Sequence, residues 1–199
     1  MQREDRRAMD EDSWKRDFVD SFPPPRLRGV KKSDLSVIAE LEATAFGTNS
    51  LTRSALDVIF DPCGDLWLLA SDEEGVWGHS VNVRGADPTV GWIAGMAIHP
   101  DRQRLGWGKL LLQATIERFH DFDVDVIRLT VKPSNKIARR LYETFNFHDT
   151  GGAADHFGPG EDRLVMSLLP SGQGKARPHF GKVDSPYVPQ IPVPDDLQF

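Results

Sequence analysis

The apolar positions of this chain follow two periods, and each period predicts a type of element. Short apolar or β-branched runs bounded by turn residues predict strands at 26–30, 66–71, 76–84, 90–98, 126–131 and 163–169. Apolar residues that recur every three or four positions predict helices at 33–46, 52–60, 108–120 and 134–145. We expect Ser33 and Ser134 to cap the first and last of these helices, and Pro62 to stop the second.

The order of these elements predicts one α/β domain over residues 26–169. Helices alternate with strands in its second half, which favours a β–α–β–α–β core and a partly parallel sheet. Residues 1–25 form a charged N-terminal arm that ends in a Pro linker. Residues 170–199 contain six prolines, which favour an extended Pro-rich tail over helices or central strands.

Composition narrows the class of protein. A chain of 199 residues with 39% hydrophobic and 27% charged residues is typical of a soluble globular domain. Its apolar runs are shorter than the ~18 residues of a membrane span, and its first residues lack the apolar core of a signal peptide. Cys63 is the single cysteine, which excludes an intrachain disulfide. We therefore expect a cytoplasmic protein that does not bind membranes.

The charge is acidic on average but basic in two places. A net charge of −6 argues against a nucleic-acid partner. Segments 102–109 and 128–140 nevertheless hold eight Lys or Arg and no acid. A multiply charged anionic ligand would be attracted to these two segments.

A glycine-rich turn between a strand and a helix lies in the first basic segment. The strand is expected to end at Ile98, and Gly106-x-Gly108 opens the helix. Free N–H groups and the helix dipole make such a helix start suitable for a phosphate. Three cationic side chains stand in the same turn: Arg102, Arg104 and Lys109.

The turn matches one known phosphate loop and not two others. A P-loop fails at Gln103 and Leu110, and a dinucleotide fingerprint fails at Leu111. The stretch from Gln103 to Gly108 instead resembles the (Arg/Gln)-x-x-Gly-x-(Gly/Ala) loop of the GNAT superfamily of N-acetyltransferases. In that family the loop holds the pyrophosphate of acyl-coenzyme A.

A second stretch, LTVKPSNKIARRLYETFNF at 129–147, resembles the other half of the same signature. The resemblance is strongest over 90–147 and weaker over 26–169. It implies the GNAT fold, a mixed central sheet with a splayed strand pair flanked by helices, and acetyl-CoA as co-substrate. Tyr142 would be the general acid that protonates the leaving thiolate. The cofactor-binding positions implied by the resemblance are Met96, Ala97, Ile98, Gln103, Arg104, Gly106, Trp107, Gly108, Lys109, Asn135 and Ala138.

The resemblance implies transfer of an acetyl group from acetyl-CoA to a primary amine by direct attack. The stretch 39–46, together with 134–147, is similar to N-terminal acetyltransferases of the ribosomal-protein alanine type. A peptide N-terminus and a small amine both remain open as acceptors. A non-catalytic acyl-CoA-binding module with an interaction tail is the alternative, and a homodimer is also left open.

The proton acceptor is not identified by the sequence. Related enzymes often carry a glutamate where this chain has Trp92 and Thr130, and neither residue is a base. The remaining candidates are His79, His156 and a water chain, with Asp155 and His148 nearby. The six histidines are scattered and Cys63 stands alone, so we expect no metal site.

Overall fold

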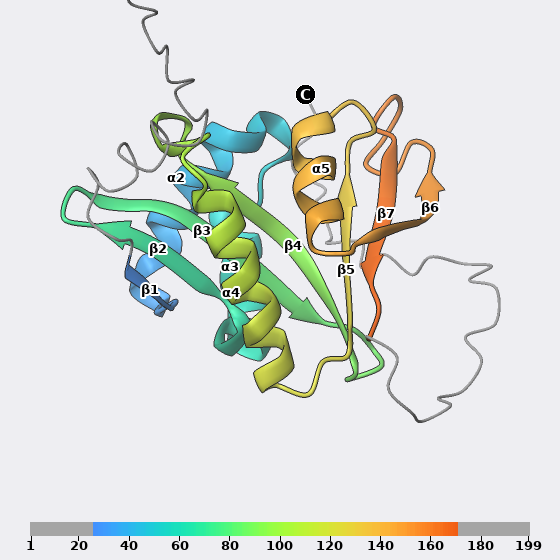
Figure 1. Cartoon of the computed structure of the whole chain (residues 1–199). Helices are drawn as coiled ribbons and strands as arrows, with labels where there is room; N and C mark the ends of the chain where they lie inside the picture. The colour runs from blue at the N-terminus through green and yellow to red at the C-terminus, as the bar shows by residue number, and fades with distance from the viewer. Residues whose placement is uncertain (1–25, 171–199) are drawn as a thin grey trace, which may run out of the picture. The chain divides into compact units, whose positions relative to one another are not determined.

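The computed structural model describes residues 26–170, which form a seven-stranded sheet with helices on both faces (Figure 1). The predictions for the N-terminal arm and the Pro-rich tail lie outside these residues. The strands are β1 (Arg26–Gly29), β2 (Leu68–Asp72), β3 (Gly75–Arg84), β4 (Val90–Ile98), β5 (Val126–Val131), β6 (His148–Ala153) and β7 (Arg163–Leu168). The α-helices are α2 (Leu35–Phe46), α3 (Arg53–Cys63), α4 (Trp107–Asp121) and α5 (Lys136–Thr144).

The sheet has the order β1-β2-β3-β4-β5-β7-β6, and its parallel pair is β4 and β5. Figure 1 shows α4 crossing the near face of the sheet and α2 and α3 lying behind it. Neighbouring residues of β3 contact helices on opposite faces of the sheet, because successive side chains of a strand point to opposite faces. His79 contacts Glu42 on α2, whereas Ser80 accepts a hydrogen bond from Thr115 on α4. The predicted mixed α/β fold is therefore confirmed.

β4 and β5 separate along their length. Their pairing runs from Val90 opposite Val126 to Ile93 opposite Leu129 and goes no further. Ala94 forms a bulge at this point, because Val81 of β3 pairs with Gly95 while Asn82 pairs with Ile93. A bulge bends its strand and increases the local twist. β4 therefore turns away from β5, and the two strands open into a V (Figure 1).

The main core lies between the sheet and the helices on both faces. α4 supplies Leu112 and Phe119, both fully buried, and α2 supplies Ile38. Phe119 lies directly on β4, since a Cβ at Gly91 would be 2.4 Å from Phe119 Cε1. A smaller core gathers Ala70, Trp77 and Trp107, and it fixes the start of α4 against the sheet.

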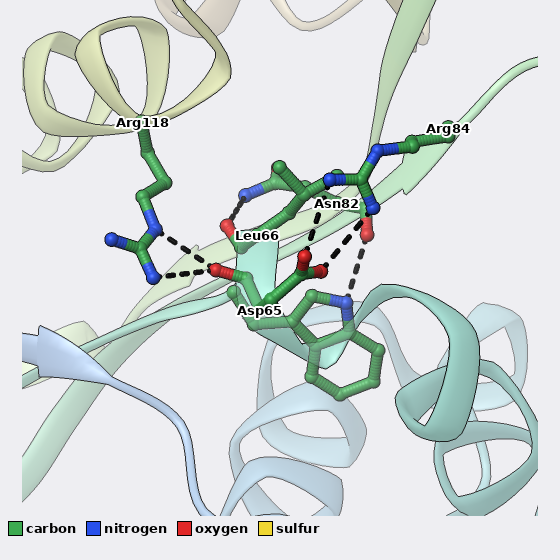
Figure 2. Close-up of polar contacts among 6 residues, drawn as sticks. Asp65, Leu66, Asn82, Arg84 and Arg118 are labelled. Carbon is green, nitrogen blue, oxygen red and sulfur yellow. Dashed lines mark hydrogen bonds and ion pairs between the residues drawn. The ribbon is translucent and has the colours of Figure 1, made fainter. Parts of the chain in front are cut away.

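A polar network with β3 and α4 holds the chain just before β2 (Figure 2). Asn82 Nδ2 donates to the Leu66 carbonyl at 2.8 Å, and Trp67 Nε1 donates to the Asn82 carbonyl at 2.8 Å. Arg118 of α4 donates to the Asp65 carbonyl through Nε and Nη2, at 2.9 and 2.7 Å. Leu66 was predicted to begin a strand, but these bonds keep it in a 3-10 turn over Gly64–Leu66.

Two helices, α2 and α3, have boundaries that differ from the predictions. α2 begins at Leu35, after a 3-10 turn over Lys32–Asp34 that contains Ser33, so Ser33 is not its cap. α3 continues through Pro62 to Cys63. The proline removes one N–H in the last turn, and the carbonyl that it frees belongs to Val58, whose side chain is 75% exposed to water.

β6 was not predicted at all. Its sequence, HDTGGA, lacks the alternation of apolar residues that marks a strand. The strand forms because β7 offers it an antiparallel partner, from His148 opposite Ser167 to Ala153 opposite Arg163.

Candidate active site

The glycine loop joins the end of β4 to the start of α4. Gln103 Nε2 donates to the Ile98 carbonyl at 3.0 Å, which ties the loop to the strand end. Gly106 has φ +85°, a left-handed conformation that favours glycine, and it is the N-cap of α4. Within residues 26–170, no backbone carbonyl accepts from the N–H groups of Trp107 and Gly108. The helix therefore presents free donors and its positive dipole end to an anion.

The side chains of the loop have different roles. Arg102 is engaged with the turn between β2 and β3, where it forms ion pairs with Asp72 at 3.1 Å and with Glu74. Arg104 and Lys109 are exposed. The Trp107 indole is buried, with its ring 5.8 Å from that of Trp77. Its contribution to the loop is therefore the backbone N–H, because its side chain belongs to the core.

The stretch Met96–Ile98 lies beyond the last pair that β4 makes with β5. On its other edge the stretch remains paired with β3, through Ile98 opposite Gly78. The edge toward β5 is consequently open to an extended ligand, which could bind it by strand addition.

α5 stands beside the start of α4. Asn135 is the N-cap of α5, and its Oδ1 accepts from the Ala138 N–H at 3.1 Å. The prediction that Ser134 caps this helix is therefore wrong by one residue. Gly108 of α4 faces Leu141 of α5, because a Cβ at Gly108 would lie 3.6 Å from Leu141 Cδ2. This contact brings the glycine loop close to the helix that carries Asn135, Ala138 and Tyr142.

Tyr142 is buried on the core side of α5. Its side chain is 9% exposed, and its ring lies 5.9 Å from that of Phe147. Burial raises the pKa of the Tyr142 phenol to about 12, because the charged phenolate is poorly solvated there. The hydroxyl therefore keeps its proton at neutral pH, as a proton donor must.

Two of the candidate bases have distinct surroundings. His79 is fully buried, and its Nε2 lies 2.7 Å from Glu42 Oε1. His156 lies between β6 and β7 with its ring 4.4 Å from that of Phe157. Partial burial, and secondly the charge of Arg163, lowers the pKa of His156 below its usual value.

Glu42 was not singled out from the sequence. It lies four residues after the buried Ile38, so it occupies a core-facing position of α2 and is itself buried. Glu42 could have been found from the sequence because it is a charged residue among the apolar positions of a predicted helix. A buried charge of this kind needs a partner.

Within the described residues, no group of three or more His, Cys, Asp or Glu side chains is placed to hold a metal ion. No helix among them is both long and apolar enough to span a membrane.

Comparison with known proteins assigns the family. The model of the acetyltransferase (GNAT) family matches residues 35–147, which is more than half of the chain. The chain belongs to this family, and the resemblance inferred from the glycine loop and the 129–147 stretch is confirmed.

Two curated relatives match parts of the chain. Mycothiol acetyltransferase of Paenarthrobacter aurescens is 30% identical over 106 residues, which are 49% of this chain and 33% of that protein. Ribosomal protein bS18-alanine N-acetyltransferase of Salmonella typhimurium is 32% identical over 76 residues, 37% of this chain and 51% of that protein. The matches thus span a third to about half of the length of these relatives.

Solved structures share the fold at low identity. The ribosomal-protein-S18-alanine N-acetyltransferase of Escherichia coli has a TM-score of 0.67 and 20% identity, over 78% of this chain and 100% of that chain. Diaminobutyrate acetyltransferase of Paenibacillus lautus, in complex with L-2,4-diaminobutyric acid and coenzyme A, has a TM-score of 0.66 and 19% identity, over 77% and 100%. The splayed mixed sheet is thus that of GNAT structures.

Proposed function

We propose that this protein transfers an acetyl group from acetyl-CoA to a primary amine. The observation that carries the proposal is the V between β4 and β5, with the glycine loop following one strand and α5 following the other. Because the two strands are parallel, their carboxyl ends meet at the same edge of the sheet, where ligands of open α/β sheets bind. Family membership and the coenzyme A complex of a structural neighbour support the same proposed function.

The cofactor would extend from the loop into the V. Its pyrophosphate would accept hydrogen bonds from the N–H groups of Trp107 and Gly108, with Arg104 and Lys109 adding charge. Its pantetheine arm would lie along the open edge of Met96–Ile98 and be flanked by Asn135 and Ala138. The Asn135 carboxamide oxygen already accepts from the Ala138 N–H, so its NH₂ group is the part left for a ligand.

The reaction would be a direct transfer. The neutral amine attacks the thioester carbonyl, a C–N bond forms, and the C–S bond breaks. Tyr142 would give its proton to the departing thiolate, since its phenol is protonated at neutral pH. Backbone N–H groups of the Met96–Ile98 stretch would stabilise the oxyanion.

The acceptor would be a peptide N-terminus or a small amine. One curated relative is named for ribosomal protein alanine and the other for mycothiol, so the relatives support both classes. We therefore keep both, together with non-catalytic acyl-CoA binding as the competing function.

A thiol-release assay with acetyl-CoA tests the proposal. The panel consists of an alanine-initiated peptide, a free amino acid, spermidine and kanamycin. We expect acceptor-dependent release of coenzyme A with at least one amine, and Tyr142→Phe should lower kcat ~10²-fold or more while calorimetry shows unchanged acetyl-CoA binding. Tight binding with no turnover of any amine would favour the non-catalytic module. Unchanged turnover of Tyr142→Phe would remove Tyr142 from the mechanism.

A further inference from the structure

A carboxylate and an imidazole are buried together beneath β4. Glu42 Oε1 of α2 lies 2.7 Å from His79 Nε2 of β3, and the two side chains are 2% and 0% exposed. The second oxygen of Glu42 accepts from the Leu51 N–H at 2.9 Å. Burial of a carboxylate is unfavourable unless it is hydrogen-bonded, and here both oxygens have donors.

The pair lies at the open part of β4. In the strand register His79 is opposite Ala97, and Val81 is opposite Gly95. A Cβ at Gly95 would lie 2.6 Å from Glu42 Oε1, so the carboxylate rests directly on the β4 backbone just past the bulge. This stretch lies beyond the last β4–β5 pair, where the proposed function places the thioester.

The hydrogen bond to Glu42 leaves the other side of the imidazole ring available. His79 Nδ1 is buried and has no hydrogen-bond partner among residues 26–170. A carboxylate that accepts from one ring N–H leaves a lone pair on the other nitrogen, and it stabilises the imidazolium that forms when a proton is taken up. A His–carboxylate pair of this kind is suited to accept a proton.

The charged side chains on the elements around the pair are paired with one another or exposed, so they do not replace Glu42 as the partner of His79. β4 carries no titratable side chain, and Asp72 of β2 pairs with Arg102. On α3, Arg53 and Asp57 pair with each other at 3.4 Å. On α2 the other acid, Glu40, is exposed.

We propose, on the basis of the function proposed above, that the Glu42–His79 pair accepts the proton that the acceptor amine releases. His79 takes the proton, and Glu42 is a positioning residue that orients the ring and stabilises its charged form. The nitrogen loses one proton to the pair as the C–N bond forms, and the electron pair of the breaking C–S bond goes to sulfur. Sulfur takes a proton from Tyr142, and the proton held by the pair returns to Tyr142 through solvent, so the net products are the amide and free coenzyme A.

The connector between α2 and α3 contacts the pair through Leu51. Leu51 is half-buried, and its Cδ1 lies 3.4 Å from the position that a Cβ of Gly95 would take. The same residue donates its N–H to Glu42. Leu51 therefore packs against the carboxylate at the open stretch of β4.

The test compares pH profiles of kcat/KM from about pH 6 to pH 10 for wild type, Glu42→Gln and His79→Gln. The probe is the amine with the highest wild-type turnover in the panel above. Glu40→Gln is the matched control, because it changes an exposed glutamate on the same helix. Circular dichroism and acetyl-CoA calorimetry report whether each variant folds and binds the cofactor.

We expect each variant of the pair to lose ~10²-fold or more at neutral pH, and to recover toward the wild-type value at high pH, where hydroxide takes the proton in place of the pair. Glu40→Gln should follow the wild type throughout. Loss by the same factor at every pH would mean a structural role and overturn the proposal, as would wild-type activity in both variants. A wild type that acetylates no amine would instead remove the proposed function, and this inference with it.

Discussion

Asn49 and Glu161, which are 112 residues apart in the chain, are joined by a hydrogen bond of 3.2 Å between Asn49 Nδ2 and Glu161 Oε2. The same carboxylate forms ion pairs with Lys132, just beyond β5, and with Arg163 at the start of β7, each at 3.0 Å. Glu161 therefore links the connector between α2 and α3 to the strands on the far side of the V.

Glu161→Gln should lower the thermal unfolding midpoint at neutral pH. Hydrogen bonds from Lys132, and then from Arg163, hold the pKa of Glu161 below its ordinary value of 4.5. Because the folded-state pKa is depressed, the stabilisation is present above about pH 4.5 and is lost as the pH falls through the lower folded value. Melting curves of wild type and variant from about pH 3 to pH 7 should therefore converge at the acid end. Exposed Glu73→Gln is the control, and a midpoint difference independent of pH would contradict the prediction.

Gly106→Ala and Gly108→Ala should behave differently. A side chain at Gly106 would have to adopt φ +85°, which costs about 1–2 kcal/mol for an L-residue. A Cβ at Gly108 would make an ordinary contact of 3.6 Å with Leu141 Cδ2, and alanine is the better helix former. We expect Gly106→Ala to lower stability and weaken acetyl-CoA binding, and Gly108→Ala to retain both. Chemical denaturation and calorimetry measure the two quantities, and equal effects of the two variants would exclude this account of the loop.

Gly95→Ala should be destabilising, whereas Gly29→Ala should be tolerated. The new methyl group at position 95 would meet Glu42 Oε1 at 2.6 Å, while a Cβ at Gly29 meets nothing within 4 Å. Overpacking of a buried site costs about 1–3 kcal/mol. The free energy of unfolding from urea titrations gives the comparison. Stability of Gly95→Ala equal to that of Gly29→Ala would mean that Glu42 can move away from β4 at little cost.

The Tyr142 phenol should titrate well above an ordinary tyrosine. The chain has two tyrosines, Tyr142 and Tyr187, so Tyr187→Phe leaves Tyr142 as the single phenol. In that variant the ultraviolet absorbance of the phenolate should rise with a midpoint near pH 12, against 10 for a free phenol. Because the folded-state pKa is raised, this burial contributes stability below about pH 10 that is lost as the pH rises toward 12. A midpoint near 10 in the folded protein would show that the hydroxyl is solvated.

The loop and the strands of the V could be predicted because their signals are local. β4 and β5 begin and end where the short apolar and β-branched runs placed them, and the glycine pattern marked the turn that precedes α4. The N-cap of α5 was misplaced by one residue, because Ser134 and Asn135 are both good caps and the backbone geometry selects between them. Pro62 was read as a helix end, although the last turn of α3 tolerates it.

The contacts between distant segments could not be read in this way. His79 was one of several candidate bases, and its bond to Glu42 depends on how α2 is laid across β3. β6 formed despite an unfavourable sequence, because β7 supplied its hydrogen-bond partners.

By itself, then, the sequence determined the family, the order of the elements other than β6 and the position of the glycine loop, since each depends on residues close together in the chain. The tertiary structure decided that Glu42 lies on Gly95 and that Glu161 reaches Asn49. Those contacts follow from the packing of whole helices and strands, so no local pattern encodes them.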